Sequence, residues 1–284
     1  FGVRLPAVLA SALGLATLCT YLYRRFSLSI ACCTAALIMA VPMWREQTSL
    51  ARGYGLSFGA AALLVVGLLR LFDERNEPSN RTITFIFAGV FVGSLAHFFC
   101  VFFVIGALVV VGWSRELTAS IRLAISWWIA LALLVPAISF AVGAPAIAIQ
   151  MGTVSTPGIH ALAERFLEEF TFRERGPLGI VLAVSSLALV VAAIAMLPAR
   201  ARRPVIVVLV FMFAGPMLAN PVYLYPRFFV HALPVVAPCI AWLMCVRIGR
   251  GKLLPTVAAV GVLVAIWGST GWTAWPYVDL RSAA

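Results

Sequence analysis

The chain has 284 residues, of which 63% are hydrophobic and only 11% are charged, with a formal net charge of +11. A soluble domain is close to half apolar and a quarter charged, so this composition excludes a soluble globular protein. The positive charge is expected to reflect membrane topology and attraction to anionic lipid, and nucleic acid is not an expected partner.

Nine apolar stretches, separated by short arginine-bearing segments, account for nearly all of the chain. A helix of about 20 residues crosses a hydrocarbon core roughly 30 Å thick, and most of the stretches have that length. Period-two alternation is absent, which favours helices over barrel strands. We therefore expect an all-α, polytopic transmembrane bundle that forms a single domain over residues 1–284. The stretches are Pro6–Tyr23, Ser27–Trp44, Tyr54–Phe72, Thr82–Trp113, Leu123–Val142, Leu178–Leu197, Val205–Leu218, Phe228–Val246 and Leu253–Thr270.

The fourth stretch, Thr82–Trp113, has 32 residues, which is too long for one span and barely enough for two. A single tilted helix would place His97 at the bilayer centre, where a polar side chain is costly. The length predicts a helical hairpin that turns near Ala96–Phe99, and hence about ten helices.

With ten helices, the cationic residues divide unequally between the two sides of the membrane. Cytoplasmic loops carry the excess of Lys and Arg, so the richer side is expected to be cytoplasmic. That side holds 13 cations: Arg24, Arg25, Arg70, Arg75, Arg81, Arg115, Arg122, Arg200, Arg202, Arg203, Arg247, Arg250 and Lys252.

The longest extracytoplasmic loop is predicted at residues 143–177. Within it, Thr156–Phe172 begins with a Thr-Pro start signal and then spaces apolar residues at helical intervals among carboxylates. The pattern predicts a short amphipathic helix on the membrane surface. Its carboxylates are typical of a solvated face, and the functional alternative is a lid over a substrate groove.

Arginines on the extracytoplasmic side stand beside aromatic residues. Arg52 is two residues before Tyr54, while Arg227 is two residues after Tyr225 and precedes His231 by about one helical turn. Interfacial anchoring explains such pairs equally well, because Arg, Tyr and Trp all favour the headgroup region. Together they indicate a site for an anionic lipid headgroup, since a guanidinium pairs bidentately with phosphate.

Short motifs in a fixed order carry a family resemblance. They are Arg4-Leu5-Pro6, Ala51-Arg52-Gly53-Tyr54, His97-Phe98, and Tyr225-Pro226-Arg227-Phe228 followed by Leu233-Pro234. The order resembles integral-membrane glycosyltransferases of the glycosyltransferase-C fold, such as protein O-mannosyltransferases and lipid A aminoarabinose transferases. The resemblance implies an enzyme that transfers a sugar from a polyprenyl-phosphate-linked donor to a lipid, glycan or protein acceptor, on the outer face of the cytoplasmic membrane.

The resemblance assigns roles to individual residues. Arg52, Tyr54, Tyr225 and Arg227 are the candidates for the donor phosphate or lipid headgroup, and Arg4, His97 and His231 are further candidates. His97 has a structural alternative, in which a histidine at a hairpin only satisfies backbone carbonyls. No cofactor is expected, and transfer with or without a divalent metal fits the resemblance.

Relatives carry acidic residues in the first extracytoplasmic loop, after their first helix. This chain begins at Phe1 and shows no such loop, so we expect that helix and the catalytic loop to lie upstream and the chain alone to be inactive. Glu46 is the sole acid near the motifs, as a weak catalytic candidate or an ion-pair partner of an arginine. The alternative function is a non-catalytic polyprenyl-lipid-binding protein, or a lipid flippase or transporter.

Overall fold

The protein is described by a computed structural model that covers residues 5–41, 44, 53–74, 77–152, 177–219, 230–248, 257 and 261. Every regular element in these ranges is a helix. Three helical segments are long and apolar enough to cross a membrane: α1 (Leu5–Arg25), α4 (Tyr54–Glu74) and residues Ala119–Gly143 of α7. Helices with exposed apolar faces are what a membrane protein requires, and Leu13, Trp127 and Val142 are 66%, 68% and 78% exposed.

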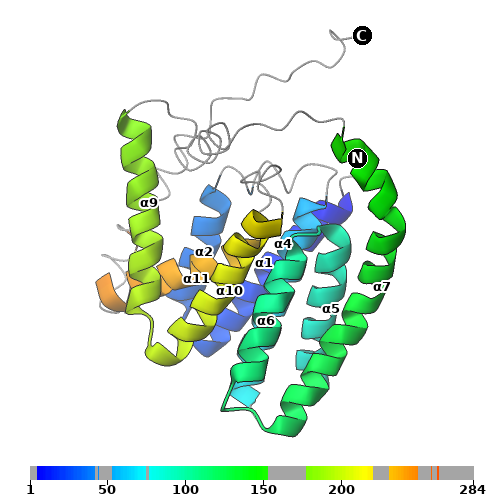
Figure 1. Ribbon diagram of the computed structural model, residues 1–284. Coiled ribbons are helices and arrows are strands. Elements are labelled where there is room, and N and C mark those ends of the chain that lie inside the picture. The colour runs from blue at the N-terminus through cyan, green and yellow to red at the C-terminus, as the bar shows by residue number, and fades with distance from the viewer. Residues whose placement is uncertain are drawn as a thin grey trace.

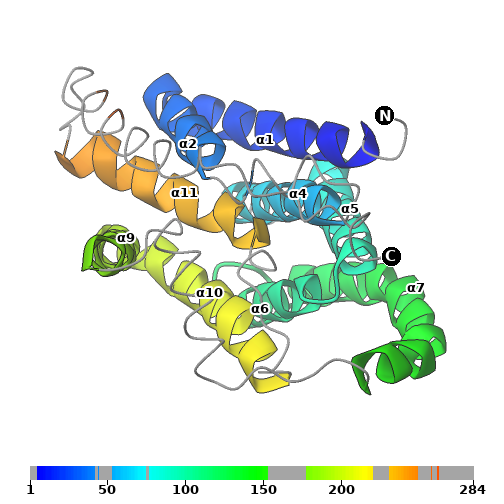
Figure 2. The ribbon, with the colours of Figure 1, turned by 90° about the horizontal axis from the view of Figure 1, so that it is seen from above.

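The helix α4 lies at the centre of the bundle and packs against α1 and α5 (Figures 1 and 2). The helix α7 packs on α5 and α6, while α10 packs on α6 and α11 packs on α2 and α9. The remaining elements are α2 (Leu28–Ala40), α5 (Asn80–Ala96), α6 (Cys100–Trp113), α7 (Ala119–Gly152), α9 (Pro177–Met196), α10 (Ala199–Ala219), α11 (Leu233–Trp242) and the π-helical turn η3 (Leu243–Ile248).

The predicted break inside Thr82–Trp113 is confirmed. The helix α5 ends at Ala96, α6 begins at Cys100, and the chain turns back between them (Figure 1). His97 ends α5 with an extended backbone (φ −157°, ψ 123°), and its N–H still donates to the Gly93 carbonyl at 3.0 Å. The turn therefore spans three residues, His97–Phe99.

Several predicted boundaries were wrong. The helix α7 continues to Gly152, through the start of the loop predicted at residues 143–177, and α10 begins at Ala199 where Val205 was predicted. The alanine-rich segment that contains Gly143 and Pro145 continues the helix, as proline-containing helices in membranes do. The predicted amphipathic helix Thr156–Phe172 lies outside the described residues, as does most of Leu253–Thr270.

Glycines and alanines set the distance between α4 and its two neighbours. A Cβ atom added to Gly59 of α4 would lie 2.4 Å from the Ala10 carbonyl oxygen of α1. A Cβ on Gly89 of α5 would lie 2.8 Å from the Ala60 carbonyl oxygen of α4. Since real Cβ contacts are not that short, both interfaces place backbone against backbone, as in small-residue packing between membrane helices.

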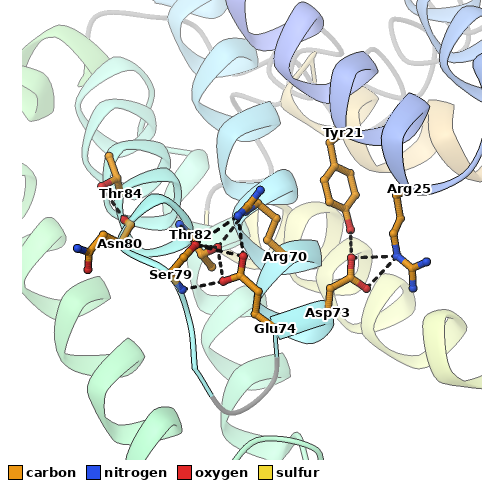
Figure 3. Close-up of polar contacts among 9 residues, drawn as sticks. All are labelled: Tyr21, Arg25, Arg70, Asp73, Glu74, Ser79, Asn80, Thr82 and Thr84. Carbon is orange, nitrogen blue, oxygen red and sulfur yellow. Dashed lines mark hydrogen bonds and ion pairs between the residues drawn. The ribbon is translucent and has the colours of Figure 1, made fainter.

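Asp73 ties one end of α4 to α1. Its carboxylate accepts a hydrogen bond from the Tyr21 hydroxyl at 2.7 Å and from Arg25 Nε at 3.0 Å (Figure 3). Both donors come from the last turns of α1, so the contact fixes where α1 ends relative to α4.

Glu74, the next residue, ties α4 to α5 instead (Figure 3). Its carboxylate accepts from Arg70 Nη2 at 2.6 Å, from the Ser79 backbone N–H at 2.7 Å and from the Thr82 hydroxyl at 2.7 Å. Ser79 is also the N-cap of α5, because its hydroxyl accepts from the Thr82 N–H. One carboxylate thus organises the turn between α4 and α5.

The packing of α4 on α1 predicts that Gly59→Ala destabilises the protein. The added methyl must displace the backbone of Ala10, and forced overpacking costs about 1–3 kcal/mol. Thermal unfolding of the detergent-solubilised protein should show a lower midpoint. Gly112→Ala is the matched control, because a Cβ there meets nothing within 4 Å and alanine favours a helix, so its midpoint should be unchanged or higher. Equal midpoints for both variants would contradict the packing described here.

Candidate functional site

Tyr54 and His97, which come from two separate sequence motifs, meet at one end of the bundle. Tyr54 is the first residue of α4 and is 6% exposed, and His97 follows α5. Their ring centroids are 5.2 Å apart with a 37° angle between the planes. The structure therefore brings together two of the residues that the sequence predicted for one site.

The pair is held by a backbone contact directly beside it. A Cβ atom on Gly53 would lie 2.2 Å from the Ala96 carbonyl oxygen, so a larger residue there would separate the start of α4 from the end of α5. The N–H of Ser57 donates to the Gly53 carbonyl at 2.8 Å, which continues the α-helical pattern into this residue. Glycine at 53 is therefore required for Tyr54 to reach His97.

The imidazole of His97 has a structural role in the turn. Its Nδ1 accepts a hydrogen bond from the Phe99 N–H at 3.3 Å. When Nδ1 of a neutral imidazole accepts, the proton is assigned to Nε2, which is then a donor. The structural alternative for His97 was a bond to a backbone carbonyl, whereas this contact is with a backbone N–H. The contact assigns the role of donor to Nε2.

Phenylalanines, which the sequence analysis did not single out, surround the turn. Phe98 is 40% exposed and stacks on Phe140 of α7 with ring centroids 4.5 Å apart. Phe98 also meets Phe102 edge to face at 5.9 Å, and a Cβ on Gly215 of α10 would lie 2.3 Å from the Phe102 ring. The run Phe98-Phe99 followed by Phe102-Phe103 was the available signal, and it gives this end of the bundle apolar walls.

His231 lies in the 3₁₀ turn Val230–Ala232 that precedes α11, and its side chain is fully buried. The α-helix predicted over Phe228–Val246 begins only at Leu233, because Pro234 suits a first helical turn and not the turn before it. The prediction that His231 follows Arg227 by one helical turn on a shared face involves a residue outside the described ranges. The other predicted site residues, Arg4, Glu46, Arg52, Tyr225 and Arg227, lie outside the described residues.

All carboxylates of the described residues gather at the opposite end of the bundle, which we call the arginine-rich end. It contains Asp73, which pairs with Arg25, and Glu74, which pairs with Arg70, both at the end of α4. It also contains Glu116, which pairs with Arg200, in the α6–α7 turn. Glu77 lies in the α4–α5 turn. Over the described ranges, no three His, Cys, Asp or Glu residues form a group that could hold a metal. Among the described residues, the Tyr54 end therefore offers aromatic rings and neutral donors.

The contact between Tyr54 and His97 predicts that cysteines at these two positions can be cross-linked. In a cysteine-free background, Tyr54→Cys with His97→Cys should react with a short bis-maleimide to give a species whose peptides 54 and 97 are linked in a mass spectrum. Tyr54→Cys with Trp113→Cys is the control, since Trp113 ends α6 about 20 Å along the helix from the turn. Cross-linking of the control pair alone would refute the arrangement.

No family model, curated protein or solved structure matches this chain. The resemblance to glycosyltransferases accordingly rests on the short motifs in the sequence. What the fold adds is the meeting of two of those motifs, Gly53-Tyr54 and His97-Phe98, at one end of an all-helical membrane bundle.

Proposed function

We propose that this chain belongs to an integral-membrane glycosyltransferase that uses a polyprenyl-phosphate-linked sugar as donor and transfers the sugar to a lipid, glycan or protein acceptor. The observation that carries the proposal is the 5.2 Å approach of the Tyr54 and His97 rings. Tyr54 and His97 belong to motifs that are 43 positions apart in the sequence. A shared site would explain why the chain carries both motifs.

The chemistry at this end suits a phosphate attached to an apolar chain. A phenol hydroxyl and an imidazole N–H are donors that a phosphate oxygen accepts, and Arg52 and Arg227 would add guanidinium donors. Exposed Phe98 and Phe140 offer an apolar surface of the kind an isoprenoid requires. The group that leaves in the transfer is the polyprenyl phosphate, so donors placed here would stabilise its developing negative charge.

The proposal assigns donor binding to the Tyr54 end and leaves acceptor activation to other residues. An acceptor hydroxyl must lose its proton to a base, commonly a carboxylate. The described carboxylates lie at the arginine-rich end, so none of them serves this site. The proposal includes the finer architecture of about ten helices in the glycosyltransferase-C arrangement, in a cytoplasmic membrane with the Tyr54 end outside.

Replacement of the proposed phosphate ligands should abolish transfer in the full-length protein. Removing one donor that stabilises a developing anion typically lowers the rate by about 10²–10³-fold, so Arg52→Ala and Arg227→Ala should each lose activity to that extent. Tyr54→Phe should lose less, because it removes a neutral donor. The measurement is release of polyprenyl phosphate from polyprenyl-phosphate mannose by membranes that contain the protein.

Tyr23→Phe is the matched control, because Tyr23 is 56% exposed at the other end of the bundle and should behave as wild type. Retention of labelled donor on the purified protein separates binding from chemistry. Wild-type binding without any transfer would favour the non-catalytic polyprenyl-lipid-binding alternative. Undiminished transfer by both arginine variants would refute the assigned roles.

A further inference from the structure

A groove of about 320 Å³ opens on the surface of the arginine-rich end, between α1 and α5 with α4 beneath. Four arginines line it, together with apolar and hydroxyl side chains. The lining residues are Leu13, Ala16, Thr17, Thr20, Tyr21, Arg24, Arg25, Val66, Arg70, Arg81 and Phe85. The volume falls in the lower part of the range for small-molecule sites, roughly 300–1,000 Å³.

From this groove we infer a binding site for an anionic phospholipid of the adjacent leaflet, with its phosphate at Arg24 and Arg81 and the upper part of an acyl chain along α1. The site is independent of the proposed glycosyl transfer, because it lies at the other end of the bundle.

The charges of the groove do not cancel. Asp73 pairs with Arg25, and Glu74 pairs with Arg70 (Figure 3). Among the residues that the structure describes, neither Arg24 nor Arg81 has a carboxylate partner, and both side chains are exposed. The groove therefore keeps two positive charges in excess, which a phosphodiester complements and the ammonium of a zwitterionic lipid does not.

The groove is graded from polar to apolar along α1. Arg24 and Arg25 stand at its end, the hydroxyls of Thr20 and Thr17 follow, and Leu13 is the last lining residue. Arg24 and Leu13 are eleven residues apart, or about 16 Å along the helix, which is close to half of a 30 Å hydrocarbon core. A phospholipid has the same gradient over the depth of one leaflet.

Three of the four arginines, Arg25, Arg70 and Arg81, are held in position by groups around them. The guanidinium of Arg81 lies 5.4 Å from the centroid of the Phe85 ring, which lines the same groove. Asp73 holds Arg25 and the Tyr21 hydroxyl beside Arg24. Val66 is buried and forms the floor, while Leu13 is 66% exposed and leaves the apolar part open to lipid. A bound lipid would meet a preformed surface.

The test is native mass spectrometry of the detergent-solubilised full chain with dioleoyl phosphatidylglycerol or dioleoyl phosphatidylcholine at equal concentration. The wild type should retain the anionic lipid preferentially. Each arginine near a membrane surface contributes about fivefold to the affinity for anionic lipid, so Arg24→Gln with Arg81→Gln should weaken phosphatidylglycerol binding by roughly 25-fold. Phosphatidylcholine binding should change little.

Arg115→Gln with Arg203→Gln is the matched control. It removes the same charge from exposed arginines of the α6–α7 turn and of α10, neither of which lines the groove. Equal losses in the two double variants would show a general charge effect and overturn the site. Unchanged preference in the groove variant would overturn it as well.

Ala16→Phe tests the acyl-chain part without touching an arginine. Ala16 is exposed and lines the groove, so a phenyl ring there should obstruct the chain and lower phosphatidylglycerol retention, while inorganic phosphate should compete only weakly in the wild type. If Ala16→Phe retains the lipid fully, or if inorganic phosphate displaces it at equal concentration, the site is one for a free anion and the proposal fails.

Discussion

The close approach of α4 to α1 and α5 is the constraint on which the rest of the bundle depends. In lipid, apolar side chains gain little by leaving one apolar neighbour for another, so helices associate through packing and polar contacts between backbones. Gly59 meets the backbone of α1, and Gly89 meets the backbone of α4. Ser11, buried in the first of these interfaces, lies 3.1 Å from the Gly55 carbonyl oxygen of α4 and 2.9 Å from the Ala7 carbonyl oxygen of its own helix. A side chain larger than those of Gly59, Gly89 and Ser11 at these positions would separate the helices and expose α4.

Because α4 is fixed between its neighbours, both of its ends become defined places. At one end, consecutive carboxylates reach different helices: Asp73 binds α1 and Glu74 binds α5. Neighbouring residues on an α-helix point about 100° apart, which is why two adjacent acids can serve two partners. At the other end, Gly53 lets Tyr54 contact His97. The same helix thus carries a charged network and an aromatic contact at positions set by its length of 21 residues.

The sequence predicted the features that depend on length and hydropathy, and missed those that depend on which helices touch. The length of Thr82–Trp113 and the cost of placing His97 at the bilayer centre together predicted the turn near Ala96–Phe99. Length alone is not decisive, because α7 continues unbroken for 34 residues. The loop predicted to begin at residue 143 begins later, because α7 continues through Gly143 and Pro145, and membrane helices tolerate both residue types. For the site, the meeting of Tyr54 with His97 followed only from a resemblance, because nothing in the spacing of two motifs says that their helices are neighbours. Arg24 and Arg81 were interpreted as topology signals, and their common groove becomes visible only when α1 and α5 are placed on α4.

The two proposed anion sites lie at opposite ends of one rigid helix and differ in how they are built. At the Tyr54 end the described donors are a phenol and an imidazole among aromatic rings, and further cations must come from Arg52 and Arg227 if a phosphate is to bind there. At the arginine-rich end four arginines already line the groove, and the carboxylates of Asp73 and Glu74 pair with only two of them, Arg25 and Arg70. A helix of 21 residues spans about 31 Å, so the two phosphates would occupy separate leaflets. Because a charged headgroup crosses the hydrocarbon core only at high cost, each site draws on its own leaflet, and the phospholipid at the arginine-rich end does not compete with a polyprenyl-linked donor at the other.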